Sequence, residues 1–367
     1  MPCERVFGGM TVLVLLASLF AQAVASERVE PRKAAAATLT AQAPRPDAAP
    51  VPKPVKPGDK GTVRVAIVPV VSLGPYMIAR EKGFFEEEGI RIEEMLSRNS
   101  AVRLQATISG NVDFASTGFD ADVISAIQQG APLRIVLPIA REREGFTFNW
   151  WLIRKDLWDS GQVRDFKDFK GRRITVGTAR ASVSDMLLRL ALKQAGLTVG
   201  DITFVVMNHP EVPAALAAKA VDIAESLDPF AQAAIDRGHA HRLRSAVSAF
   251  PGGVLDLAVL IMNTSFYRDK PELARGFVRA WLRGAEFFNA ALQHGRNRDE
   301  FNRILAKFSE LPLEVLGKIG YPEVPRDGRL NEPSVLRMMD FFFEEKAIPR
   351  KVNAVSEITE YGVLPSR

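Results

Sequence analysis

The sequence predicts an α/β protein with two lobes, each built on one copy of a repeated βαβαβ unit. Short apolar segments alternate along the chain with helical segments about ten residues long, which is typical of parallel βαβ units. The pattern Val-Asp-apolar-Ala occurs at Val112–Ala115 and again at Val221–Ala224, at the same place in each copy. Two apolar strands, Asn149–Arg154 and Asp256–Met262, stand where the chain would cross between the lobes.

The first copy is predicted from strands and helices that mostly end at glycines. Its strands are Val63–Val68, Ile90–Met95, Val112–Ala115 and Leu133–Leu137, and its helices are Tyr76–Phe85, a segment that begins at Ser100 and stops before Gly110, and Phe119–Gln129.

The second copy repeats this order, and a helical region follows it. Its strands are Arg173–Val176, Ile202–Val206 and Val221–Ala224, and its helices begin at Ser182, with Asp185 forming a capping box, and at Glu211. The later segments Pro271–Phe288, Phe301–Phe308, Pro312–Ile319 and Pro333–Lys346 are predicted to be helical. In the first of these, apolar residues recur every three or four positions, as expected of a helix packed on a core.

The N-terminus is typical of an export signal. A basic start is followed by the apolar run Met10–Phe20 and by Ala23-Val24-Ala25, so cleavage is expected after Ala25. The alternative is an uncleaved membrane anchor, for which the run is short. The single cysteine, Cys3, precedes the apolar run, so the exported chain would contain no cysteine.

Residues 26–61 are rich in Ala, Pro and Lys and are predicted to be a disordered spacer. This segment holds seven Lys and Arg against four acids, and therefore most of the net charge of +5 that the whole chain of 367 residues carries. The folded part is close to neutral, which argues against a nucleic-acid partner.

Several motifs resemble one family of transport proteins. The run Ala79-Arg80-Glu81-Lys82-Gly83-Phe84-Phe85, the segment Ser109–Ala115, the segment Lys167–Ile174 and the tripeptide Asp228-Pro229-Phe230 are similar to the substrate-binding components of ABC transporters for alkanesulfonates, taurine, nitrate and the thiamine pyrimidine precursor. The last motif has Asp where the family usually has Glu. The resemblance spans about Val63 to Ile348.

This resemblance implies the type II periplasmic-binding-protein fold, with extra C-terminal helices. After the signal peptide at 1–25 and the spacer at 26–61, it divides the chain into a first part of lobe one at 62–143, lobe two at 144–254, and a return strand with C-terminal helices at 255–367. It also implies a periplasmic protein that delivers a small molecule to a transporter permease. Membrane contact would come only through the permease or an uncleaved anchor.

Ligands of open α/β sheets bind beyond the carboxyl ends of the strands. The candidate ligand-binding residues at those ends are Ser72, Tyr76, Asn99, Ser100, Thr117, Phe119, Thr178, Arg180, Ser182, Asn208, Glu225 and Asp228, with Trp150 as an aromatic wall. Arg180 and the helix start after it suit an anion, whereas Glu225 suits an amine, so the charge of the ligand stays open.

Other functions have less support in the sequence. It contains no G-x-S-x-G, Walker or H-E-x-x-H motif, and His239-Ala-His241 is interpreted as an exposed loop, so no catalytic residue, metal or cofactor is expected. A pyrimidine-precursor synthase-like enzyme is a further alternative. The resemblance would require a cysteine-rich segment for that activity, and this chain contains none. A ligand sensor for a membrane partner remains the alternative that the long spacer favours.

Overall fold

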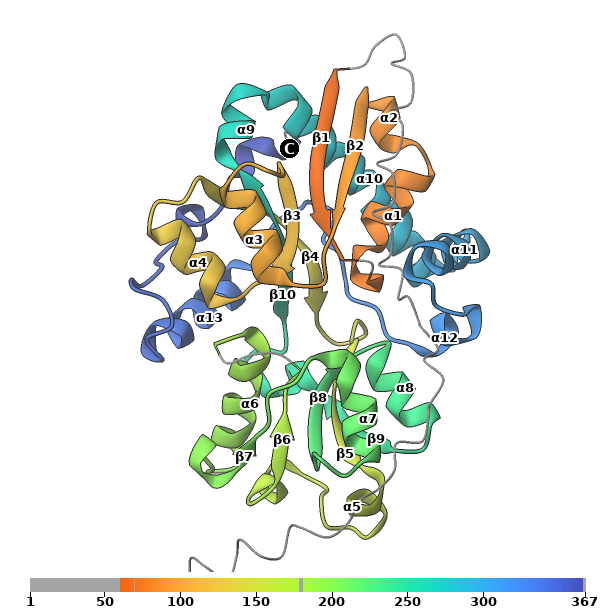
Figure 1. Cartoon of the computed structure of the whole chain (residues 1–367), viewed down its shortest axis with the longest axis vertical. Coiled ribbons are helices and arrows are strands. Elements are labelled where there is room, and N and C mark those ends of the chain that lie inside the picture. The colour runs from red at the N-terminus through yellow and green to blue at the C-terminus, as the bar shows by residue number, and fades with distance from the viewer. Residues whose placement is uncertain (1–59, 69, 178–180, 366–367) are drawn as a thin grey trace, which may run out of the picture. The chain divides into compact units, whose positions relative to one another are not determined.

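The computed structural model describes residues 60–68, 70–177 and 181–365. Two five-stranded sheets carry these residues, in the orders β2-β1-β3-β10-β4 and β7-β6-β8-β5-β9. We call the first sheet and its helices lobe one, and the second sheet and its helices lobe two (Figure 1). The predicted α/β architecture of two lobes is confirmed.

Lobe one combines the N-terminal unit with the C-terminal helices. Its strands are β1 (Gly61–Ile67), β2 (Ile90–Leu96), β3 (Phe114–Gly118), β4 (Leu133–Glu142) and β10 (Leu255–Asn263). Its helices are α1 (Gly74–Glu81), α2 (Phe84–Glu87), α3 (Ser100–Ile108), α4 (Ala121–Gln128), α9 (Thr264–Asp269), α10 (Pro271–His294), α11 (Arg298–Ser309), α12 (Leu313–Lys318) and α13 (Glu332–Glu344).

Lobe two is smaller. Its strands are β5 (Asn149–Arg154), β6 (Arg173–Thr175), β7 (Thr203–Phe204), β8 (Ile223–Leu227) and β9 (Ala240–Ser245). Its helices are α5 (Lys155–Asp159), α6 (Val183–Gln194), α7 (Val212–Ala217) and α8 (Phe230–Asp236). Short 3-10 turns connect these elements in both lobes, at Val71–Leu73, Phe166–Phe169, Val199–Asp201, His209–Glu211, Ala246–Ala249, Val355–Glu357 and Tyr361–Val363.

The repeated Val-Asp-apolar-Ala motif has the same structural role in both lobes. Asp113 accepts hydrogen bonds from the backbone N–H of Arg64, at 2.8 Å, and from its guanidinium, at 2.6 Å. Asp222 accepts the corresponding bonds from Arg173, at 2.9 and 2.8 Å. Each aspartate therefore ties the central strand of its sheet to the strand that opens the unit, and the internal duplication extends to individual hydrogen bonds.

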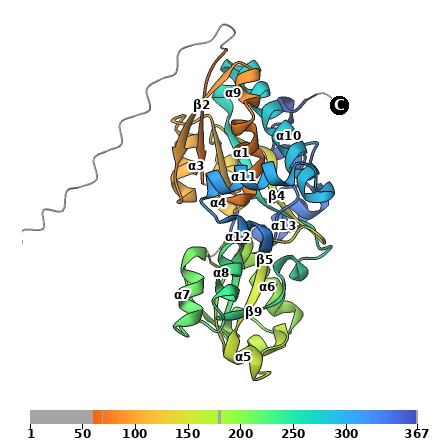
Figure 2. The same cartoon turned by 90° about the vertical axis from the view of Figure 1, so that its right-hand side faces the viewer.

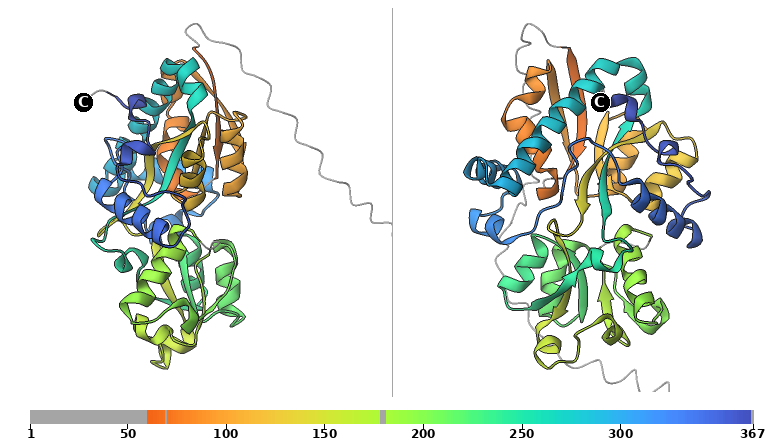
Figure 3. Two further views of the ribbon diagram at one scale, coloured as in Figure 1. Left: turned by 90° about the vertical axis from the view of Figure 1, so that its left-hand side faces the viewer. Right: turned by 180° about the vertical axis from the view of Figure 1, so that it is seen from behind.

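Helices cover both faces of the lobe-one sheet, as the side views in Figure 2 and Figure 3 show. On one face α1, α10 and α11 pack around a core that includes the fully buried Trp281 and Phe288. On the other face α3, α4 and α13 pack around a core that includes Ile124 and Met338 and continues into lobe two. The Met338-Met339 and Phe341–Phe343 segment serves packing, because Met338, Met339 and Phe342 are all fully buried.

Three elements of lobe two were not predicted from the sequence: strand β9 and the short helices α5 and α8. Residues 240–245, which include His241 of the predicted exposed loop, form strand β9 antiparallel to β5. The strand was missed because its half-exposed, basic residues resemble a solvated loop, while its stability comes from backbone pairing with a buried neighbour. Helices α5 and α8 were missed because they are only five and seven residues long, which is too short to show an apolar periodicity.

The predicted helix 76–85 is two helices. Gly83 has a left-handed backbone, with φ of 73°, which ends α1 and begins α2 in a new direction. The lobe limits expected at 143/144 and 254/255 stay a prediction. The export signal with Cys3, and the spacer apart from its last two residues, lie outside the described residues. Within the described part of the chain, no helix is long and apolar enough to cross a membrane.

Candidate ligand-binding site

The lobe-one candidates follow strands β1, β2 and β3. Thr117 and Phe119 are buried at the end of β3, with exposed fractions of 4% and 0%. Ser72 is half-buried in the turn after β1. Asn99 caps α3, its side chain accepting a hydrogen bond of 3.0 Å from the N–H of Ala101, and Ser100 is the first residue of that helix.

Tyr76 lies inside the core of lobe one. Its ring is fully buried between those of Phe85 and Trp281, each with a centroid separation of 5.6 Å, and its hydroxyl donates to Glu94. Burial and the nearby carboxylate raise the pKa of this hydroxyl well above its usual value. Because its ring and hydroxyl already have partners, Tyr76 is the weakest of the predicted ligand contacts.

The lobe-two candidates are spread over three strand ends. Ser182 caps α6, and its hydroxyl accepts a 3.1 Å hydrogen bond from the N–H of Asp185, as the capping-box pattern predicts. Asn208 is exposed after β7 and bonds to Glu211 in the same turn. Thr178 and Arg180 lie outside the described residues.

Glu225 is the most enclosed of the predicted site residues. It is fully buried on β8, where one carboxyl oxygen accepts hydrogen bonds from Asn149 and, at 2.8 Å, from the hydroxyl of Ser184. Its second oxygen has no hydrogen-bond partner. Desolvation raises its pKa to about 8, so this carboxyl group is mostly protonated at neutral pH.

A second buried acid, Glu142, lies where the chain leaves β4 for lobe two. One of its oxygens accepts from the N–H groups of Phe148 and Asn149, at 2.9 and 2.8 Å, and the other has no partner. Burial raises its pKa to about 8, and the nearby Glu225 and Asp228 add to the shift. Glu142, Asn149 and Glu225 thus form a connected group of buried polar side chains between the two sheets.

Asp228 joins the end of β8 to lobe one. It accepts hydrogen bonds from the indole N–H of Trp150 at 3.0 Å and from the backbone N–H of Gly320, after α12, at 2.8 Å. Arg242 lies 4.4 Å from the ring centre of Trp150 and 3.4 Å from Asp228. The Trp150 side chain is therefore held against lobe two by an acid and a guanidinium.

Asp120 forms a second link between the lobes. It directly precedes α4 in lobe one, where its side chain makes no capping hydrogen bond, and its carboxylate accepts a 3.0 Å hydrogen bond from the N–H of Val183, the first residue of α6 in lobe two. Desolvation raises the pKa of Asp120 to about 6. The turn after β3 in lobe one is thus within hydrogen-bond distance of the start of α6 in lobe two.

The structure brings some predicted residues together and leaves others apart. Glu225 belongs to the connected polar network with Glu142 and Asn149, and Asp228 bonds to Trp150 close enough to this network to raise the pKa of Glu142. Asn208 has only local partners. The network also contains Glu142, Asn149 and Ser184, which the sequence interpretation did not select. The sequence gives little sign of their role, because a polar residue looks the same in the sequence whether the fold buries it or leaves it at the surface.

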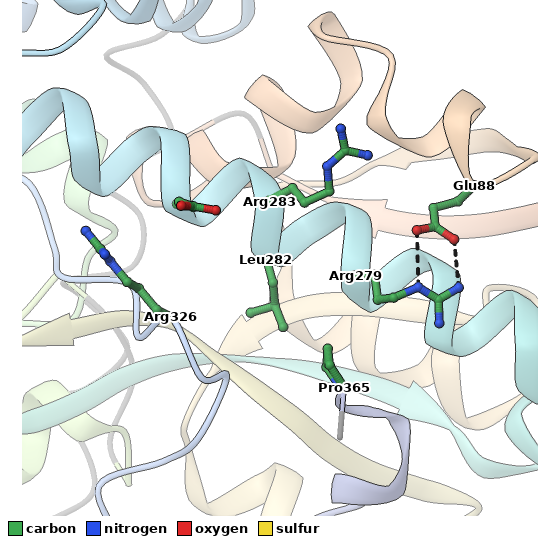
Figure 4. Close-up of a pocket in the computed structure, with 7 residues that line it drawn as sticks. Glu88, Arg279, Leu282, Arg283, Arg326 and Pro365 are labelled. Atoms are coloured by element: carbon green, nitrogen blue, oxygen red, sulfur yellow. Dashed lines mark hydrogen bonds and ion pairs between the residues drawn. The ribbon is translucent and has the colours of Figure 1, made fainter. Parts of the chain in front are cut away.

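A separate pocket lies on lobe one, along α10. It is lined by Glu88, Arg279, Leu282, Arg283, Glu286, Arg326 and Pro365. Figure 4 shows Glu88 paired with Arg279, at 2.7 and 3.1 Å. None of its residues belongs to the network between the lobes. Among the described residues, no group of three His, Cys, Asp or Glu side chains is placed to hold a metal ion.

The two sheets have the same strand order, and in each the fourth strand, β10 or β5, is the one that the chain forms on crossing from the other lobe. This arrangement defines a type II periplasmic-binding-protein fold. The chain belongs to the family described as NMT1/THI5 like, whose model matches residues 71–292. The match covers the first copy of the repeated unit apart from β1, all of the second copy, and most of α10.

Individual relatives are distant. The chain is 26% identical over 193 residues to a binding protein of Brucella abortus, covering 53% of this chain, and it spans about half (51%) of that relative's length. It is 26% identical over 254 residues to the riboflavin-binding protein RibY of Chloroflexus aurantiacus, covering 68% of each chain. The solved aliphatic sulphonate binding protein SsuA of Escherichia coli superposes with a TM-score of 0.65 at 20% identity, covering 82% of this chain and 92% of that one.

Proposed function

We propose that this chain is an exported solute-binding protein, which captures a small polar organic solute between its lobes and presents it to the permease of an ABC importer. The observation that carries the proposal is the connected polar network of Glu142, Asn149 and Glu225. Buried polar atoms normally have hydrogen-bond partners, and this network leaves two carboxyl oxygens and an amide oxygen without one. A polar solute could supply the missing hydrogen-bond partners.

The fold supplies the other requirement of such a protein. Both lobes direct the carboxyl ends of their parallel strands toward the junction, where Asp120 and Asp228 bridge from one lobe to the other. Closure of two lobes around a solute is a hinge motion about the connecting strands. We propose the sequence-selected residues Ser72, Thr117, Trp150, Ser182 and Glu225 as ligand contacts on this basis.

The proposed activity requires no covalent chemistry. Affinity would come from convergent hydrogen bonds and from enclosure of the solute. The relatives named above are described as binding proteins. For the same reason we propose a periplasmic location and a permease partner, with the export signal at residues 1–25 cleaved.

Thermal denaturation of the purified chain, with a panel of solutes, tests the proposal. The panel contains nitrate, ethanesulfonate, taurine, riboflavin and 4-amino-5-hydroxymethyl-2-methylpyrimidine. A solute at 100 times its Kd stabilises the folded state by about 2.7 kcal/mol, which raises the melting temperature by several degrees. Isothermal titration then gives the Kd of each hit. A folded protein that responds to no solute of a wide panel, and co-purifies with none by native mass spectrometry, contradicts the proposal.

A further inference from the structure

We propose that Asp120 determines which charge the site accepts: its carboxylate occupies the start of α6, so that oxyanions are excluded and solutes with N–H donors are preferred. The inference rests on the proposed solute-binding function and narrows it to a class of ligand. Such solutes are neutral or cationic nitrogen compounds, such as amines, amidines or aminopyrimidines.

The carboxylate of Asp120 is bound to the first residue of α6 in the other lobe. Its Oδ1 accepts from the backbone N–H of Val183 at 3.0 Å. The N–H groups in the first turn of a helix lack acceptors within the helix and attract negative charge. An oxyanion bound between the lobes would use such a group, and here a carboxylate of the same chain already takes it.

Gly118 allows this position of Asp120. A Cβ atom at residue 118 would lie 2.3 Å from Oδ2 and 2.9 Å from Cγ of Asp120. Real Cβ atoms do not approach other atoms so closely, so any larger residue at position 118 would displace the carboxylate. The pair Gly118 and Asp120 therefore forms one unit, in which the glycine makes room for the folded-back acid.

The charges around the junction favour the same class of solute. Glu142 and Glu225 each have a buried carboxyl oxygen without a hydrogen-bond partner. Their pKa values of about 8 leave both groups partly ionised at pH 8, and in the ionised form this oxygen accepts a hydrogen bond from an N–H group of a solute. Two guanidinium groups among the described residues are held in place: Arg103 donates to the carbonyls of Ser97 and Ser116, and Arg242 bonds to Asp228 and Gln232. No salt bridge pairs Arg103 with an acid in the described part of the chain, and Nε of Arg242 has no partner. An oxyanion at the start of α6 would thus meet the carboxylate of Asp120 first, because that group already accepts from the N–H of Val183.

Two substitutions separate the charge of Asp120 from its size. Asp120→Ala removes the carboxylate and opens the N–H of Val183, and Asp120→Asn keeps the size and an acceptor oxygen but removes the charge. Asp122→Ala and Asp122→Asn are the matched controls, because Asp122 is exposed on α4 two residues away. Gly118→Ala displaces Asp120 without changing any charge.

Titration calorimetry at pH 8 with sodium nitrate, sodium ethanesulfonate and 4-amino-5-hydroxymethyl-2-methylpyrimidine is the test. At this pH Asp120 is ionised, since its pKa is about 6. Asp120→Ala is expected to bind one of the anions at least about tenfold more tightly than the wild type, with Asp120→Asn in between and the Asp122 variants unchanged. Gly118→Ala is expected to shift in the same direction as Asp120→Ala. Circular dichroism verifies that each variant is folded.

The inference is overturned if the wild type binds nitrate or ethanesulfonate as tightly as Asp120→Ala, or if no Asp120 variant gains affinity for an anion. Hydrogen exchange of the α6 start gives a readout that needs no solute: protection of the Val183 amide should fall in Asp120→Ala and stay unchanged in Asp122→Ala. Equal protection in the two variants contradicts the contact itself. Tight binding of an anion by the wild type would leave the proposed transport function standing, whereas absence of any bound solute would remove that function even if Asp120 protects Val183.

Discussion

Buried carboxyl groups are the unusual residues of this protein. Glu142 and Glu225 are fully buried, and neither has a cation among its hydrogen-bond partners in the described part of the chain. Desolvation disfavours their charged forms, which raises the pKa of each to about 8. In the unfolded chain a glutamate titrates near pH 4.3. The folded protein therefore holds protons that the unfolded chain releases between these pH values.

This difference makes stability depend on pH. Between about pH 5 and 8 the folded state binds more protons than the unfolded state, so the free energy of unfolding falls as pH rises, by up to about 1.4 kcal/mol per pH unit for each group. Glu225→Gln removes one of these groups and should flatten the dependence. Urea denaturation from pH 5 to pH 9 measures it, and Glu93→Gln, at an exposed position on β2, is the control. Equal slopes for Glu225→Gln and the wild type would contradict the assignment.

At the scale of elements, two aspartates tie strands of each sheet together. Asp222 accepts from the backbone and guanidinium of Arg173 and also from Arg154, whereas Asp113 accepts from Arg64 alone. Both aspartates are buried, with exposed fractions of 7% and 2%. Their removal would leave guanidinium groups and a strand N–H without their acceptor.

We expect Asp222→Ala to lower the free energy of unfolding by about 3 kcal/mol, since several charge-assisted hydrogen bonds are lost together. Asp113→Ala should cost the same or somewhat less, because it has one arginine partner instead of two. Urea denaturation at pH 7 measures both variants, and Asp122→Ala controls for the loss of a carboxylate. A cost under 1 kcal/mol for Asp222→Ala would contradict this role of the repeated motif.

Helices α1 and α10 approach each other closely at Gly284. A Cβ atom there would lie 2.0 Å from the carbonyl oxygen of Pro75. Gly284→Ala should therefore destabilise the protein by roughly 1–3 kcal/mol, because the backbone of one helix must move. Gly317→Ala is the matched control: Gly317 lies in α12 with no atom within 4 Å of an added Cβ, so this change should stabilise by about 0.5–1 kcal/mol. Melting temperatures that shift in the same direction for both variants would contradict the contact.

At the scale of the whole molecule, polar contacts join the two lobes besides their connecting strands, including the ion pairs Arg189–Glu345 and Lys318–Asp236. Asp120 reaches from lobe one to α6, and Asp228 reaches from lobe two to Gly320. Gly320 passes close to the chain that enters β5, since a Cβ there would lie 1.8 Å from the carbonyl oxygen of Thr147. The Asp228 contact therefore lies beside one of the two crossings between the lobes.

Asp228→Ala should loosen the lobes while each lobe stays folded. The N–H of Gly320 and the indole N–H of Trp150 lose their acceptor, and Arg242 loses a carboxylate. The expected result is a larger radius of gyration by X-ray scattering and faster amide exchange around Gly320. Asp159→Ala, an exposed acid on α5, is the control. Unchanged scattering and exchange in Asp228→Ala would contradict a role of the Asp228 contact in holding the lobes together.

The sequence by itself determined the architecture, because hydrophobic periodicity, glycine stops and the repeated Val-Asp-apolar-Ala motif are local signals. The strand Asn149–Arg154 was predicted with its observed bounds, and Ser182 with Asp185 was predicted as the cap of α6. Local patterns could not reveal strand β9, which depends on pairing with β5.

Only the tertiary structure decided what the polar residues do. Tyr76 was predicted at the site and is packed in the core, while Glu142 and Asn149 join the network with Glu225 although they lie 76 to 83 residues away in sequence. Whether an acid is solvated, paired or buried depends on atoms that distant segments bring to it. Those atoms also set its pKa, so the chemistry of the junction between the lobes follows from the folded arrangement.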